Sequence, residues 1–198
     1  MRRFEQIGGH PAIDFVNTLG GRPDDPDDEY LNCYNDLLAW TERAGLVQPS
    51  CVSDLKDVAT TDPESADAAL ERARLLRESL DRLLRANLNP KTQPRMGDAA
   101  TIRAAYIEAL TNAALQPHDL RLAWNWPADI DDLDRPLWPI ALAAVDLFQT
   151  APLRLLAQCQ HCRWLFLDTS RQHNRRWCSM NACGAIVKMR RYRAARRP

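Results

Sequence analysis

The stretch CQHCRWLFLDTSRQHNRRWCSMNACG, residues 159–184, holds four of the six cysteines of this 198-residue chain. They form two close pairs, Cys159 with Cys162 and Cys178 with Cys183, and fifteen residues separate the pairs. Two such pairs can meet at one point and present four sulfurs tetrahedrally, which is the donor set of structural zinc sites. The spacing therefore predicts one structural Zn²⁺ per chain, with these four cysteines as its ligands.

Two other interpretations of the cysteines stay open at this stage. The Cys159-x-x-Cys162 spacing also occurs in redox pairs, and the four thiols could be unlinked. His161 and His173 are rival ligands because each lies near a cysteine, although neither is needed once four sulfurs are present. Four sulfurs leave no coordination position for water or substrate, so the zinc is expected to be structural and not catalytic.

The residues around the cysteines predict how the zinc-binding segment folds. WLFLDT and RRWCS flank the polar turn SRQHN, so we expect the spacer to form a hairpin. Cys183 and Gly184 are expected to open a helix, whose dipole stabilises a thiolate at its N-terminus. Together these elements predict a small treble-clef-like zinc finger with Trp164 and Trp177 in its core. A segment of about 40 residues buries too little surface to fold alone, and zinc supplies the missing stability.

Charge divides the chain near residue 150. Residues 1–150 carry 15 Lys and Arg against 25 Asp and Glu, whereas residues 151–198 carry 11 against one. A basic segment of this kind indicates a polyanionic partner, and DNA is the partner we expect. Two domains are therefore predicted, 1–150 and 151–198. In the alternative, the basic finger docks on the acidic domain, and the chain is a ligand-binding or protein-interaction module without DNA.

The basic side chains lie around the last two cysteines and on the helix that follows them. At 100° per residue this helix carries two basic stripes, the first of them headed by Ile186. Arginines on two faces of a short helix can straddle a phosphate backbone, and a merely solvated basic face is the alternative. The predicted nucleic-acid contacts are Arg175, Arg176, Lys188, Arg190, Arg191, Arg193 and Arg197.

The first 150 residues predict a mainly helical domain with a small β component, which makes the fold class α+β. N-caps, prolines at the first helical position and apolar periodicity place the helices at 30–45, 53–59, 62–88, 98–115 and 136–150. Residues 119–126, DLRLAWNW, alternate as a strand does, with Trp124 and Trp126 on a core or interface face and a partner strand near 89–97. Residues 8–21 fit a short helix or an extended segment, and 22–30 fit an acidic loop.

Other candidate residues are few. Asp14 and Asn17 could line a small-molecule pocket, in which case the domain senses an effector, or they could form capping and turn hydrogen bonds. Cys33 and Cys51 are expected to be core or half-buried thiols. The sequence has no GxSxG, no HExxH and no phosphate-cradling glycine loop, so no enzyme activity and no catalytic residue are predicted.

The cellular location of the chain is predicted from the length of its apolar stretches. No run of about 18 apolar residues predicts a membrane span, and the N-terminus has no apolar signal core. A cytoplasmic protein without a membrane partner is therefore expected, whose helical domain senses an effector or forms a homodimer.

The segment CQHC…FLDTSRQHNRRWCSMNACG resembles the bacterial CGNR-type zinc finger. The region that begins GGHPAIDFVNT and continues through NDLLAWTERAGLV is similar to the ABATE domain that precedes that finger. The resemblance spans essentially the whole chain, implies a stress-induced transcription regulator, and gives the same four cysteines as zinc ligands. The motif Cys-Gly-Asn-Arg reads Cys183-Gly184-Ala185-Ile186 here, so zinc binding is expected to survive while the contact made by the Asn-Arg pair is lost.

Overall fold

The computed structural model describes residues 4–21, 28–89, 91, 93–127 and 132–196. Contacts divide the chain into two compact units, one of Met1–Tyr30 with Thr150–Pro198 and one of Leu31–Gln149. The N-terminal segment therefore groups with the cysteine-rich segment and not with the helices that follow it in sequence. The sequence-based division at residue 150 assigns that segment to the helices, and it remains a prediction about domains.

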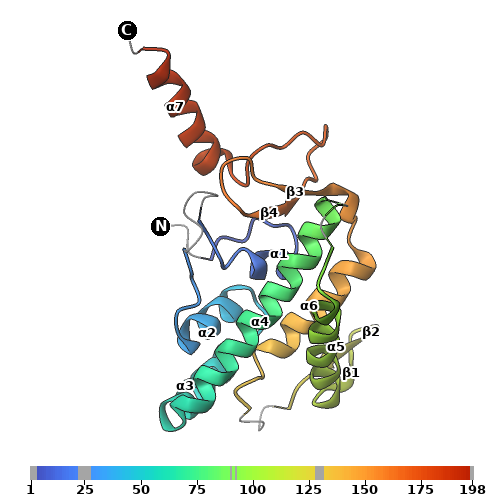
Figure 1. Cartoon of the computed structure of the whole chain (residues 1–198). Coiled ribbons are helices and arrows are strands. Elements are labelled where there is room, and N and C mark those ends of the chain that lie inside the picture. Colours follow the sequence, from blue (N-terminus) through green and yellow to red (C-terminus); the bar gives the residue numbers. More distant parts are fainter. Residues whose placement is uncertain (1–3, 22–27, 90, 92, 128–131, 197–198) are drawn as a thin grey trace. The chain divides into compact units, whose positions relative to one another are not determined.

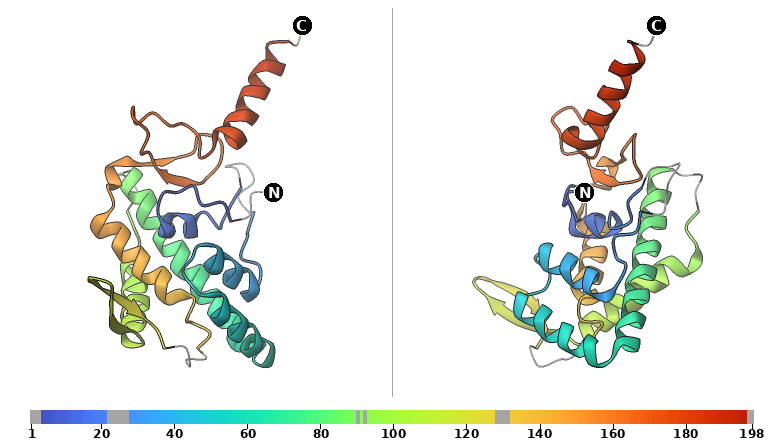
Figure 2. Two further views of the ribbon diagram at one scale, coloured as in Figure 1. Left: turned by 180° about the vertical axis from the view of Figure 1, so that it is seen from behind. Right: turned by 90° about the vertical axis from the view of Figure 1, so that its left-hand side faces the viewer.

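The described part of the second unit consists of helices and one β-hairpin (Figure 1). Every helix described is too short or too polar to span a lipid bilayer. Of these helices, α4 and α5 pack directly against each other (Figure 2). The elements are α2 (Tyr34–Arg43), α3 (Pro49–Thr61), α4 (Pro63–Leu88), α5 (Met96–Thr111), β1 (Ala114–His118), β2 (Arg121–Asn125) and α6 (Leu137–Thr150).

The longest helix, α4, begins and packs as its sequence predicts. The Asp62 carboxylate accepts a hydrogen bond from the Ser65 N–H at 3.1 Å, and Pro63 occupies the first helical position. Both features favour a helix start, because they satisfy or remove a free N–H. Leucines four residues apart form its buried face, and they are Leu76, Leu80 and Leu84. The α+β fold class is confirmed, since helices dominate and the sheets are small.

Three helix ends differ from expectation by four residues, more than the others do. α2 begins at Tyr34 and not at residue 30, and Cys33 at its N-cap is exposed, which corrects the prediction of a core or half-buried thiol there. α3 begins at Pro49 and not at residue 53, because proline suits the first turn. α5 ends at Thr111 instead of near 115. Gly45 ends α2 as expected, with a φ of +69° that suits a residue without a side chain.

The hairpin of β1 and β2 corrects the expected strand pairing. β2 pairs antiparallel with the strand directly before it, with Leu115 opposite Trp124, and not with residues 89–97. Leu122 and Trp124 are 64% and 43% exposed, so this face does not lie in the core of the described chain. Trp126 is part-buried, and its Nε1–H donates to the Ala109 carbonyl at 2.9 Å. Alternation alone shows that a strand has two different faces, but not which element packs on either.

The first unit joins two distant parts of the sequence. It contains α1 (Pro11–Val16), a 3-10 turn (Leu153–Leu155), β3 (Leu156–Gln158), β4 (Leu165–Leu167), a π-helical turn (Met180–Gly184) and α7 (Ala185–Ala194). The opening stretch is thus a short helix, whose N-cap His10 accepts from the Ala12 N–H at 3.2 Å. Within this unit α7 leads away from β3 and β4 (Figures 1 and 2).

The spacer between the cysteine pairs does not form the expected hairpin. β4 pairs with β3, which precedes the first cysteine pair, so that Gln158 stands opposite Leu165. The described residues 168–178 contain no strand and return to the second cysteine pair as a loop. The first cysteine pair therefore lies in the turn of a hairpin, and the treble-clef-like order holds only for this cysteine turn and the final helix.

Candidate metal centre

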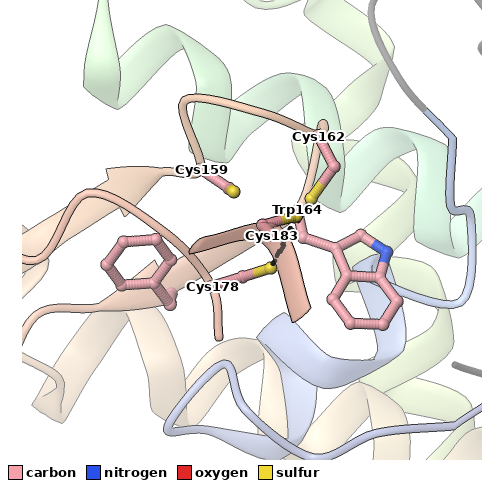
Figure 3. Packing of buried hydrophobic residues seen from close by; sticks show 6 residues of the cluster. Cys159, Cys162, Trp164, Cys178 and Cys183 are labelled. Carbon is pink, nitrogen blue, oxygen red and sulfur yellow. Dashed lines mark hydrogen bonds between the residues drawn. The ribbon is translucent and has the colours of Figure 1, made fainter. Parts of the chain in front are cut away.

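Four cysteine sulfurs converge in the first unit (Figure 3). The Sγ atoms of Cys159, Cys162, Cys178 and Cys183 all lie within 4.8 Å of one another. The Sγ of Cys178 is 3.6 Å from that of Cys162 and 3.7 Å from that of Cys183. A tetrahedral zinc with Zn–S bonds of about 2.3 Å requires sulfurs about 3.8 Å apart. The donor set therefore fits one structural zinc ion and completes its coordination shell.

Backbone hydrogen bonds hold each cysteine pair in position for the metal. The Cys159 N–H donates to the Trp164 carbonyl at 2.9 Å and closes the turn between β3 and β4. The Gln160 N–H donates to the Arg176 carbonyl at 3.0 Å, which brings the second pair alongside the first. Cys183 lies in the π-helical turn directly before α7. The predicted helix after the fourth cysteine is thus present, and a zinc ligand sits at its start.

Hydrogen bonds among the buried thiols shift the pKa of Cys159, Cys162 and Cys178. All four cysteines are at most 8% exposed. Hydrogen bonding with Cys159 and Cys178, together with burial, raises the pKa of Cys162. Hydrogen bonding with Cys159 is also the main cause that raises the pKa of Cys178 to about 12, whereas the same contacts lower the pKa of Cys159. A bound divalent cation would favour the thiolate form of all four.

A small apolar core surrounds the sulfurs. Trp164 and Phe166 pack with the four cysteines, and Trp177 lies partly buried against them, which confirms the predicted role of both tryptophans. Ile7 and Tyr30 pack on the same core, and the Tyr30 ring meets Trp164 edge-on at 6.3 Å. Because Ile7 and Tyr30 come from the N-terminal segment, that segment supplies part of the metal site's surroundings.

The N-terminal segment also hydrogen-bonds to β4. Asn17 donates through Nδ2 to the Leu165 carbonyl and accepts through Oδ1 from the Leu165 N–H, both at 2.8 Å. The Leu167 N–H donates to the Gly8 carbonyl at 2.8 Å. These bonds satisfy the edge of β4 that faces away from β3. The finger is therefore completed by residues about 150 positions earlier in the sequence.

Asp14 holds this segment in shape. Its Oδ1 accepts from the Ile7 N–H at 2.9 Å and from the Gly8 N–H at 2.7 Å. Burial raises the pKa of Asp14 to about 6 despite these hydrogen bonds. Asp14 therefore orients the loop whose Gly8 carbonyl meets β4. Asp14 through Oδ1 and Asn17 through both polar side-chain atoms bond to backbone groups of this unit, which gives both a structural role. Their role in binding a ligand stays a prediction.

Asp168 is a residue that sequence reasoning missed. Its carboxylate accepts from the Ser170 N–H at 3.0 Å, the Ser170 Oγ–H at 2.6 Å and the Arg175 N–H at 2.8 Å. Hydrogen bonds, chiefly from Ser170, hold the pKa of Asp168 below its usual range. The His173 ring meets the Asp168 carbonyl at 2.8 Å, so this loop engages the rival ligand. The available signal was that Asp168 is the only acid among the eleven basic residues of 151–198.

Arg175 belongs to the interior of the finger and not to its basic surface. Its guanidinium lies 4.2 Å from the centroid of the Phe166 ring and donates to the Trp177 carbonyl at 3.0 Å. It also contacts the Cys178 carbonyl, next to a zinc ligand. These contacts hold Arg175 half-buried in the finger, and its contact with DNA stays a prediction.

The other predicted DNA-contacting residues are exposed wherever the structure describes them. Arg176 is exposed, and Arg197 lies outside the described residues. None of the ten residues of α7 is buried, and its exposed cations are Lys188, Arg190, Arg191 and Arg193.

Comparison with known protein families gives two matches. Residues 9–151 match ABATE, described as "Putative stress-induced transcription regulator", and residues 156–196 match the CGNR zinc finger. No curated protein matches the chain. The border between the two matches differs from the border between the compact units, because α1 lies in the first match but belongs to the same unit as β4.

Replacing Cys178 with serine tests the metal site. We expect one zinc per purified wild-type chain by elemental analysis and a large loss of zinc in Cys178→Ser, because a ligand is removed. Far-UV circular dichroism should retain most of its helical signal, since α2 to α6 lie in the other unit. Cys51→Ser, which changes a buried thiol of α3, is the control and should keep its zinc. Full zinc occupancy in Cys178→Ser would contradict the assignment.

Replacing Asn17 with alanine tests whether the N-terminal segment completes the finger. The change leaves the buried N–H and C=O of Leu165 without partners, at about 1–3 kcal/mol for each group. The free energy of unfolding of the first unit should fall by at least about 2 kcal/mol, and a chelator should remove zinc at lower concentration. Asn174→Ala, at an exposed asparagine of the same unit, is the control. Equal chelator sensitivity in Asn17→Ala and wild type would disprove the role of the segment.

Proposed function

This chain belongs to the ABATE family and carries a CGNR zinc finger, and from this premise we propose that it is a cytoplasmic transcription regulator whose finger binds double-stranded DNA. One observation supports the proposal above the others. Helix α7 follows a zinc ligand directly, buries none of its residues and carries several cations and no acid. This is the composition of a helix that binds phosphates.

The energetics of α7 support a polyanionic partner. A ten-residue helix is marginal in water unless it packs an apolar face, and α7 packs none. Its like charges repel one another, although arginines in the last turn interact favourably with the helix dipole. Phosphates would neutralise these charges and stabilise the helix, so DNA binding is expected to order α7 further.

The zinc ion anchors this helix but has no chemical role in the proposal. Cys183 fixes the start of α7 to the cysteine cluster, which holds the cations in a defined place. Four thiolates and Zn²⁺ together carry two negative charges, so the eleven basic residues of 151–198 still dominate. Because the sulfurs fill the coordination shell, we assign no catalytic step to the metal.

In this proposal, regulation or dimerisation falls to the second unit. The hairpin of β1 and β2 exposes Leu115, Leu122 and Trp124 on its surface. Adjacent exposed apolar side chains of this kind are typical of protein–protein interfaces, which supports a homodimer.

The dependence of DNA affinity on salt tests the proposal. If Arg176 and the four exposed cations of α7 each neutralise one phosphate, log Kd should change with log salt with a slope of roughly 4.5. Affinity for duplex DNA would then fall roughly 500-fold between about 50 and 200 mM salt. Electrophoretic mobility shifts of the full chain across a salt series measure this. The double variant Arg190→Gln/Arg193→Gln should lower the slope by about 1.8, whereas Arg121→Gln on β2 should not.

The outcome of that series separates the two sequence-based interpretations. Absence of DNA binding by the zinc-loaded full chain at low salt would overturn the proposal and favour the interaction module without DNA. Salt-independent binding would also contradict it, because phosphate contacts release counterions.

Position 186 offers a gain-of-function test. Ala185 and Ile186 stand where the family motif has Asn and Arg, and both are exposed in the first turn of α7. Ile186→Arg should therefore tighten DNA binding and raise the salt slope by about 0.9, because it adds one phosphate contact. Leu120→Arg adds the same charge to the exposed turn between β1 and β2 and should leave both quantities unchanged. Weaker binding by Ile186→Arg would show that this turn does not face DNA.

A further inference from the structure

A pocket in the second unit has no part in the proposed DNA binding. Its cavity of about 250 Å³ lies among α4, α5 and the start of α6. A cavity of roughly 150 Å³ already admits benzene, so this one accommodates a ring with a short substituent. Most of its walls are apolar, and they are formed by Leu75, Leu76, Ala104, Ala105, Leu137 and Trp138.

The charged residues that line this pocket, Arg72, Glu108 and Asp134, sum to one negative charge. The Arg72 guanidinium donates to the Asp134 carboxylate at 2.8 Å, so these two opposite charges compensate each other. Glu108, on α5, also lines the pocket, and among the described residues no basic side chain forms an ion pair with it. The pocket therefore presents an uncompensated negative charge beside apolar walls.

The Trp138 indole lies beside this carboxylate. Trp138 is 1% exposed, and its N–H interacts with the Glu108 carboxylate. Burial, with Asp134, raises the pKa of Glu108, whereas the hydrogen bond with Trp138 lowers it. A cation bound at Glu108 would favour the charged carboxylate and so strengthen its hydrogen bond with the indole N–H.

We propose that this pocket binds an amphipathic organic cation, such as an arylalkylammonium ion. Its ammonium group would pair with Glu108, and its ring would pack on the leucines and alanines. An anionic ligand of the same size would meet Glu108 and Asp134 and be repelled, so the site should select by charge.

Titration calorimetry on the zinc-loaded full chain tests this site with three probes of one size. They are 2-phenylethylammonium, the neutral 2-phenylethanol and the anionic phenylacetate. The ammonium ion should bind about tenfold or more tightly than the alcohol, since a hydrogen bond to a charged group is worth that much, and phenylacetate should bind least. Glu108→Gln should abolish this preference, whereas Glu64→Gln, at an exposed acid of α4 outside the pocket, should keep it.

A second variant tests the location without touching the carboxylate. Ala105→Leu narrows the pocket and should weaken the ammonium ion and the alcohol alike. The proposal is overturned if the ammonium ion shows no saturable binding, if phenylacetate binds more tightly, or if neither Glu108→Gln nor Ala105→Leu changes the affinity. None of these results depends on DNA binding, so failure here and failure of the proposed function are distinguishable.

Discussion

The first unit depends on one interaction, the coordination of a divalent cation by four buried sulfurs. The turn between β3 and β4 and the segment before α7 share only a few hydrogen bonds, and the sulfurs of both converge at one point. Without the cation, four thiols crowd together, and hydrogen bonds among them raise the pKa of Cys162 and Cys178 while they lower that of Cys159. When the ion binds, its bonds to the four sulfurs become the main stabilising contact of the unit.

The cation does not hold the finger alone. β3 and β4 form a two-stranded sheet, and such a sheet is marginal unless something covers it. The N-terminal segment does this through Asn17 and Gly8 and adds Ile7 and Tyr30 to the core around the sulfurs. The ABATE match begins at residue 9, so the N-terminal part of one matched family is a structural part of the other. The two families therefore meet inside one compact unit.

Sequence alone predicts the features that local chemistry determines. The cysteine spacing gives the donor set, and Asp62 with Pro63 and the leucine periodicity give α4. It misses what distant contacts determine. Nothing near Asn17 indicates that its side chain binds Leu165, and nothing near Arg175 distinguishes an arginine stacked on Phe166 from one that faces solvent. The strand at β2 is predicted correctly but its partner is not, because pairing depends on the adjacent turn. The pocket beside Glu108 likewise cannot be predicted from the sequence, since residues of three helices line it.

The first unit thus carries a zinc-anchored basic helix, and the second unit carries a pocket of opposite charge preference. The basic helix depends on one zinc ion that is bound by four sulfurs and by no other donor. X-ray absorption at the zinc edge of the purified full chain measures this directly. We predict four sulfur scatterers at about 2.3 Å and no nitrogen or oxygen in the first shell. A shell with fewer than four sulfurs, or one that includes a histidine nitrogen or a water oxygen, would contradict it.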